Sequence, residues 1–134
     1  MKTLKTIFSS MVLITLLSVS VMAQSGAKVI AVVNKADWCP SCEKNGERAM
    51  TALMENNEDK VVQFVVNDLT NDETKTKSAE KIEKVGLTQA IAEYKSTGAV
   101  YFFNAETKKL ISKISVAKSD QELALAITKA KKTL

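Results

Sequence analysis

The stretch AKVIAVVNKADWCPSC, from Ala27 to Cys42, decides the fold. Its first half, up to Asn34, is a continuous apolar run rich in valine, which is typical of a strand buried on both faces. Its second half holds both cysteines, the one tryptophan and the one proline of the 134-residue chain. Pro40 suits the first position of a helix, because that position needs no N–H donor. We therefore predict a strand followed at once by a helix, with Cys39 at the helix N-cap.

Two further segments continue this pattern toward the middle of the chain. Residues 60–68 are again apolar and β-branched, and they predict an interior strand parallel to the first, because strand–helix–strand units are right-handed crossovers. A lysine- and glutamate-rich helix with a solvated charged face follows, introduced by a predicted capping box at residues 70–73. The apolar spacing then predicts a second helical piece over residues 87–95.

The last third of the chain predicts two strands and a helix. Residues 98–104 and 109–116 are separated by a short turn, so the two strands are expected to pair antiparallel. Ser119 and Glu122 have the spacing of a second capping box, which opens a C-terminal helix. The predicted order is β-α-β-α-β-β-α, without repeats or an internal low-complexity linker.

The first 23 residues have the layout of a secretory signal peptide. Two lysines precede an uncharged apolar run from Ile7 to Met22, and we expect cleavage after Ala23. The run is shorter than the roughly 20 residues that a membrane-spanning helix needs, so an uncleaved anchor is the less favoured alternative. We predict one domain, residues 24–134, that is exported to the periplasm or the cell exterior.

Charge and cysteine count limit the possible functions. The chain has 19 Lys and Arg against 15 Asp and Glu, a net charge of +4 that falls to +2 without the predicted leader. This balance does not favour nucleic acid or an anionic membrane surface as a partner. Two cysteines are also too few for a disulfide scaffold, which in small secreted domains usually takes four or more.

The two cysteines are spaced for reversible disulfide chemistry. Cysteines three residues apart across a helix start have Cα atoms roughly 5 to 6 Å apart, which a disulfide accepts. The free N–H groups and the dipole at the helix N-terminus stabilise a thiolate on Cys39. Since the thiolate is the attacking species in disulfide exchange, we predict Cys39 as the nucleophile and Cys42 as the resolving cysteine.

Other uses of these residues stay open. Structural zinc normally takes four ligands, and the chain offers two cysteines and no histidine, so we predict no metal and no cofactor. A purely structural disulfide is the stronger alternative, although closing so short a loop removes little unfolded-state entropy. Trp38 is either part of the core or an apolar rim on which a substrate rests.

Residues 27–129 resemble the thioredoxin superfamily in the Trp38-Cys39-Pro40-Ser41-Cys42 motif at a strand-to-helix junction and in the order of elements around it. The resemblance implies an α/β, thioredoxin-like fold with a minimal core, in which helices flank a four-stranded mixed sheet. It also implies dithiol–disulfide oxidoreductase activity on protein disulfides or dithiols. A membrane electron donor is a candidate partner, whereas the direction of the reaction, the substrate and the oligomeric state are not specified.

Three departures from the family pattern bear on function. Only residues 24–26 precede the first strand, where thioredoxins usually have an additional strand and helix. Val33 stands where many thioredoxins have a buried acid that assists proton transfer from the second cysteine, which predicts slower exchange. Thr97 or Gly98 stands where the family has a cis-proline facing the disulfide. A cis bond at a non-proline residue costs about 3 to 4 kcal/mol, so we expect a trans bond there.

We therefore predict an exported thiol–disulfide oxidoreductase that acts on protein substrates through Cys39 and Cys42. The residues expected to border the substrate are Trp38, Pro40, Thr97 and Gly98. The alternative is a thioredoxin-fold binding module with a structural disulfide and no catalysis. A third possibility is metal handling by the two thiolates, because the family's cis-proline is held to discourage metal binding at the pair.

Overall fold

The computed structural model describes residues 26–134, so the predicted signal peptide and its cleavage point lie outside the described residues. The elements are β1 (Val29–Lys35), α2 (Pro40–Glu55), β2 (Val62–Asp68), α3 (Asp72–Lys84), α4 (Thr88–Ile91), β3 (Ala99–Asn104), β4 (Leu110–Ser115) and α5 (Asp120–Lys132). The predicted order is confirmed, with the helical segment after β2 divided into α3 and a single turn, α4. Within residues 26–134, no helix combines the length and the apolar character that crossing a bilayer requires.

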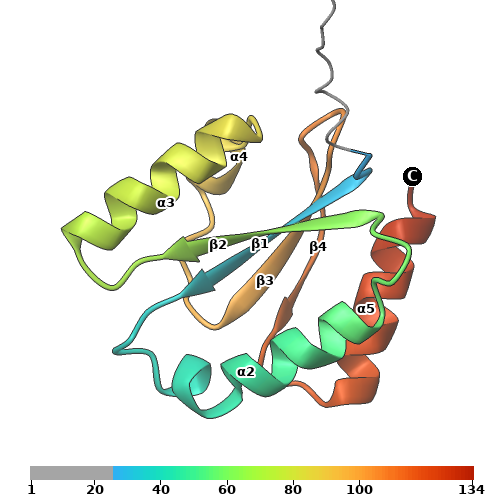
Figure 1. Ribbon diagram of the computed structural model, residues 1–134, viewed down its shortest axis with the longest axis horizontal. Helices are drawn as coiled ribbons and strands as arrows, with labels where there is room; N and C mark the ends of the chain where they lie inside the picture. The colour runs from blue at the N-terminus through green and yellow to red at the C-terminus, as the bar shows by residue number, and fades with distance from the viewer. Residues whose placement is uncertain (1–25) are drawn as a thin grey trace, which may run out of the picture.

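The strands form one four-stranded mixed sheet, as predicted, and their order in the sheet is β2-β1-β3-β4. β1 pairs in parallel with β2 and antiparallel with β3, and β3 pairs antiparallel with β4. Helices α3 and α4 lie on one face of the sheet, and α2 and α5 lie on the other (Figure 1). Because β1 is central and covered on both faces, its first six residues are all buried, which explains the unbroken apolar run.

A separate apolar core lies on each face of the sheet, and alternate β1 side chains contribute to each. The core under α2 and α5 joins Val29, Ala31 and Val33 to helix residues that include Leu53, Leu123 and Ile127. The core under α3 and α4 joins Ile30 and Val32 to Ile82, Leu87 and Ile91. β1 is thus held between two packed cores, and this fixes the position of the cysteine-containing segment that follows it.

The helix starts confirm one predicted cap and correct the other. Ser119 and Glu122 form the predicted capping box at the start of α5. At α3 the prediction was wrong by one residue: the N-cap is Asn71, whose side chain accepts a hydrogen bond from the backbone N–H of Thr74 at 2.9 Å. Thr70 is left free for other contacts, because Asn71 supplies the oxygen that the helix start needs.

Candidate functional site

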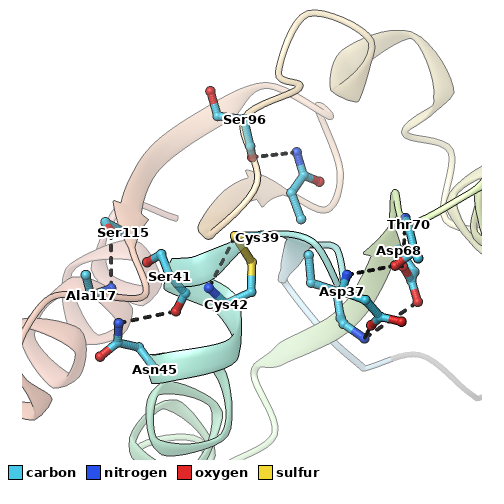
Figure 2. Close-up of a disulfide and its surroundings, with 12 residues drawn as sticks. Asp37, Cys39, Ser41, Cys42, Asn45, Asp68, Thr70, Ser96, Ser115 and Ala117 are labelled. Carbon is cyan, nitrogen blue, oxygen red and sulfur yellow. Dashed lines mark hydrogen bonds and ion pairs between the residues drawn. A yellow bond between two sulfur atoms is a disulfide. The ribbon is translucent and has the colours of Figure 1, made fainter.

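Cys39 and Cys42 form a disulfide across the first turn of α2, with Cα atoms 5.3 Å apart as the spacing predicts. Cys39 is the N-cap residue in an extended conformation, and Pro40 occupies the start of the helix. The Sγ atom of Cys39 accepts a hydrogen bond from the backbone N–H of Cys42 at 3.2 Å (Figure 2). The helix end thus directs an N–H donor at this sulfur, which is the interaction that stabilises a thiolate.

The loop before β3 covers Cys39. Gly98 has a φ of +77°, and a Cβ atom at this position would lie 3.5 Å from the Sγ of Cys39. Figure 2 shows the segment carrying Ser96 on this side of the disulfide. Cys39 is consequently only 4% exposed, while Cys42 is half-buried. Within residues 26–134 every peptide bond is trans, as expected for Thr97 and Gly98.

Asn34, at the end of β1, holds this loop in place. Its side chain is fully buried, and its Nδ2 donates to the backbone carbonyls of Tyr94 at 2.8 Å and Ser96 at 3.2 Å. Its Oδ1 accepts a hydrogen bond from the Nδ2 of buried Asn67 at 2.9 Å, and its backbone carbonyl accepts from the N–H of Gly98 at 2.8 Å. One residue of the central strand therefore fixes three points of the loop that covers the disulfide.

Thr70 performs a similar task on the other side of the motif. Its hydroxyl accepts a hydrogen bond from the backbone N–H of Asp37 at 2.9 Å and donates to the carboxylate of Asp68. Its carbonyl accepts from the indole N–H of Trp38 at 3.1 Å. Trp38 is 61% exposed, so it is not core, and this bond holds its ring at the surface beside the disulfide.

Solved structures of other proteins share this fold. Trxlp from Edwardsiella tarda EIB202 is similar over 78% of this chain and 86% of its own, with a TM-score of 0.51 and 16% sequence identity. The chain has a thioredoxin-like fold. The resemblance in the sequence is thus confirmed at the level of the fold, with the strand order and the disulfide position described above.

Other solved structures similar to this thioredoxin-like domain have lower scores. Thioredoxin from Fasciola hepatica is 17% identical, with coverage of 78% of this chain and 82% of its own and a TM-score of 0.47. A secreted disulfide oxidoreductase from Mycobacterium tuberculosis is 18% identical, with coverage of 76% and 81% and a TM-score of 0.47. No protein-family model and no curated protein matches the chain.

A cavity of about 250 Å³ lies beside Cys42 in the thioredoxin-like domain. Its apolar lining includes Val33 and its parallel cross-strand partner Val66. The titratable side chains among its lining residues are Lys35 and Glu47. Lys35 is already paired with carboxylates, at 3.6 Å from Asp68. Position 33 therefore offers no acid for proton exchange at Cys42, and Glu47 is the acidic residue that lines this cavity.

A larger cavity, about 510 Å³, lies next to Trp38 between the end of β2 and helices α3 and α4. Its apolar lining includes Leu69, Ile82 and Ile91, and its charged lining residues are Lys75 and Lys95. Trp38 forms part of the wall of this cavity, and it directly precedes Cys39 in the chain. The cavity offers room for an apolar side chain beside Trp38.

The structure brings the predicted site residues together around one disulfide. Trp38 and Pro40 are exposed on one side of it, and Thr97 and Gly98 lie in the loop on the other side. The residues that sequence analysis missed are Asn34, Asn67 and Thr70. Asn34 and Asn67 carried one usable signal, since each is a polar residue near the end of an otherwise apolar strand.

Acid is expected to weaken the thioredoxin-like domain through Asp68. Hydrogen bonds from Thr70 and the nearby Lys35 ammonium hold the pKa of Asp68 below its usual 3.8, against the opposing effect of burial. Because the pKa is lower in the folded state, this stabilisation is present above the unfolded pKa and is lost as the pH falls through the folded value. Thr70→Val should lower the free energy of unfolding at neutral pH by about 1 to 2 kcal/mol.

Urea unfolding of the wild type and Thr70→Val at pH 7 and near pH 3 measures this effect. The variant should lose less stability on acidification than the wild type, because its Asp68 has already lost its main hydrogen-bond donor. Thr70→Ser, which keeps the hydroxyl, is the matched control and should behave as the wild type. Parallel pH profiles for Thr70→Val and the wild type would show that Asp68 does not contribute in this way.

Proposed function

We propose that this protein is an exported thiol–disulfide oxidoreductase that exchanges disulfides with protein substrates. The observation that carries the proposal is the Cys39–Cys42 disulfide at a helix start, with the N–H of Cys42 directed at the Cys39 sulfur. Export is proposed from the signal-like composition of residues 1–23. The dithiol or disulfide state of the pair would be restored by a second redox partner, for which a membrane electron donor is a candidate.

The reaction transfers two electrons between the cysteine pair and a substrate. In the reducing direction, the Cys39 thiolate attacks one sulfur of a substrate disulfide, and the other substrate sulfur leaves as a thiolate that takes a proton from water. Cys42 then loses its proton and attacks the Sγ of Cys39, which releases the second substrate thiolate. The pair ends as a disulfide and the substrate as a dithiol. The same steps in reverse oxidise a substrate dithiol.

The substrate would approach where the loop and the exposed ring leave the disulfide accessible. We assign Trp38 and Pro40 to one border of this approach, and Thr97 and Gly98 to the other. The cavity beside Trp38 would take an apolar side chain of the substrate next to its cysteine. Movement of the loop held by Asn34 would be needed for full access, since Cys39 is 4% exposed.

The second candidate function is a binding module with a structural disulfide, and the burial of Cys39 favours it. Reactive cysteines are usually partly exposed, whereas buried structural ones are inert. The reduction potential separates the two candidates. A value below about −300 mV is typical of a structural bond, and a value between about −270 and −120 mV is typical of a redox-active pair. We expect a value in the second range, measured by equilibration with glutathione or dithiothreitol buffers.

Trapping of mixed disulfides tests the oxidoreductase directly. Cys42→Ser, produced with its own leader, should accumulate mixed disulfides between Cys39 and exported proteins, because the resolving thiol is absent. Cys39→Ser is the matched control and should trap much less. Reducing and non-reducing gels followed by mass spectrometry measure the adducts. If Cys42→Ser forms no adducts, the oxidoreductase proposal fails. If both single variants form adducts equally, the assignment of Cys39 as the nucleophile fails.

A further inference from the structure

One edge of the sheet is open over a short apolar stretch of β2. The strand order places β2 and β4 at the two edges. β4 has features that discourage pairing, namely exposed Lys113 and an irregular register with β3. β2 has neither: its residues 62–67 carry no charge, and all seven of its residues pair with β1 in unbroken register. An uncharged, regular edge strand is a template for pairing with another strand.

Backbone hydrogen bonds show which residues of β2 face outward. The carbonyl of Val61 and the N–H of Leu69 bond to the β1 side, at Lys28 and Lys35 respectively. Since backbone groups alternate in direction along a strand, odd-numbered residues of β2 face β1 and even-numbered residues face away from it.

The two ends of this outward edge are already covered. Val62 exchanges two hydrogen bonds with the side chain of Asn57, at 3.0 and 2.7 Å. The N–H of Asp68 donates to the hydroxyl of Ser78 at 2.8 Å. Within residues 26–134, the backbone groups of Phe64 and Val66 thus remain as the open part of the edge.

Apolar side chains accompany these open backbone groups. Val66 is 38% exposed and Phe64 is half-buried, and both belong to the face of the sheet that α2 covers. On α2, Met50 lines the same cavity as Val66, and Met54 is 57% exposed beside the start of β2. We name these four residues, Met50, Met54, Phe64 and Val66, the β2 edge patch.

The open backbone groups of β2 are spaced so that they can pair with the same groups of a second β2 strand. If two β2 strands lie antiparallel about a two-fold axis at Val65, Phe64 of each copy lies opposite Val66 of the other. Each of these opposed pairs has both N–H and both C=O groups facing outward, so it can form two backbone hydrogen bonds. The side chains also form aromatic–β-branched cross-strand pairs, which stabilise sheets. A two-fold axis that joins one surface to the same surface is the commonest arrangement of protein dimers.

We propose that the open edge of β2 pairs antiparallel with the same edge of a second copy of this chain, joining two four-stranded sheets across a two-fold axis at Val65. The strand introduces no like-charge contact, because residues 62–67 are uncharged and Asp68 at its end is paired with Lys35. Val66 lines the cavity beside Cys42, so the second copy covers one wall of that cavity. The proposal does not depend on the activity proposed above.

Sedimentation equilibrium over a dilution series tests the dimer, using protein purified from the exported fraction with the N-terminus that processing leaves. The wild type should be a dimer that dissociates on dilution. Val66→Lys should weaken association at least about tenfold, because it places a charge in the pairing region. Leu125→Lys, which adds the same charge at a 54% exposed apolar residue of α5, is the matched control and should dimerise as the wild type. The Cys39→Ser, Cys42→Ser double variant should also dimerise, which excludes an intermolecular disulfide.

Amide hydrogen exchange of the wild type locates the interface without a variant. The N–H groups of Phe64 and Val66 should exchange fast in dilute protein and slow down as the dimer forms. The N–H of Asp68 donates a hydrogen bond to the hydroxyl of Ser78 in each copy. It is the internal control, and its exchange rate should not change with concentration. A monomer at all concentrations, a dimer in which these two amides stay fast, or a Val66→Lys dimer of wild-type affinity would overturn the proposal. Protection of both amides in the monomer would also overturn it, because the edge would then already be covered within a single chain.

Discussion

Replacement of Asn34 by alanine is expected to lower the free energy of unfolding by about 2 to 4 kcal/mol and to uncover the disulfide. The side chain is fully buried and bonded to Tyr94, Ser96 and Asn67. Alanine leaves the carbonyls of Tyr94 and Ser96 and the side-chain amide of Asn67 without their hydrogen-bond partner. Each buried unsatisfied group costs about 1 to 3 kcal/mol before water relieves part of the loss. Urea unfolding measures the stability, and the rate of reduction by dithiothreitol measures access to the sulfurs.

Asn67→Ala is the matched control for this prediction. It removes one hydrogen bond to the Asn34 side chain but leaves the two bonds that hold the loop. We expect a loss of about 1 kcal/mol and little change in the rate of reduction. Equal rates of reduction in Asn34→Ala, Asn67→Ala and the wild type would contradict the role of Asn34 in covering Cys39, whatever the change in stability.

Restoring an acid beside Cys42 is expected to accelerate the resolving step. Val33→Asp places a carboxyl at the wall of the cavity that Cys42 lines. General acid–base catalysis typically contributes about 100-fold or more, and we expect at least a tenfold faster release of substrate from a mixed disulfide. Stopped-flow measurement of leaving-thiol release from a preformed Cys39 adduct follows this step alone.

Val33→Asn separates proton transfer from polarity in this experiment. Asparagine has nearly the same shape as aspartate but cannot accept the proton, so it should not accelerate release. Both substitutions place a polar group in an apolar position that is 5% exposed, and both are therefore expected to lower stability. Rates are compared below the urea concentration at which either variant unfolds. Equal acceleration by both substitutions would show that water entry, rather than the carboxyl, limits the step.

The parts of this protein that were predictable from sequence depend on local patterns. The apolar run of β1 identifies a strand covered on both faces, and Pro40 identifies the helix start, because both signals depend on neighbouring residues. The disulfide span follows for the same reason. The Ser119 cap was predicted from a spacing of three residues, although the same spacing after β2 misled, since Asn71 competes with Thr70 for the cap.

The parts that were not predictable depend on contacts between distant segments. Asn34 bonds residues about sixty positions away, and Thr70 bonds Trp38 across more than thirty. No periodicity in the sequence identifies such partners. The burial of Cys39 likewise follows from the positive φ of Gly98 and from the anchoring of its loop. The motif therefore indicates the chemistry, whereas the access of a substrate to it depends on tertiary contacts.

The connection between β2 and β3 has a consequence for protein engineering. Its first residues include Thr70, which positions Trp38, and its last residues are those that Asn34 holds above Cys39. The intervening helices α3 and α4 line the cavity next to Trp38. The exposed positions of residues 71–93 can thus be varied between these two anchors. Ser78, Ile82, Leu87 and Ile91 must stay, because they bond the end of β2 or form the core on this face. A library varied at these exposed positions would change the surface offered to a partner while the core, the cysteines and their helix stay unchanged.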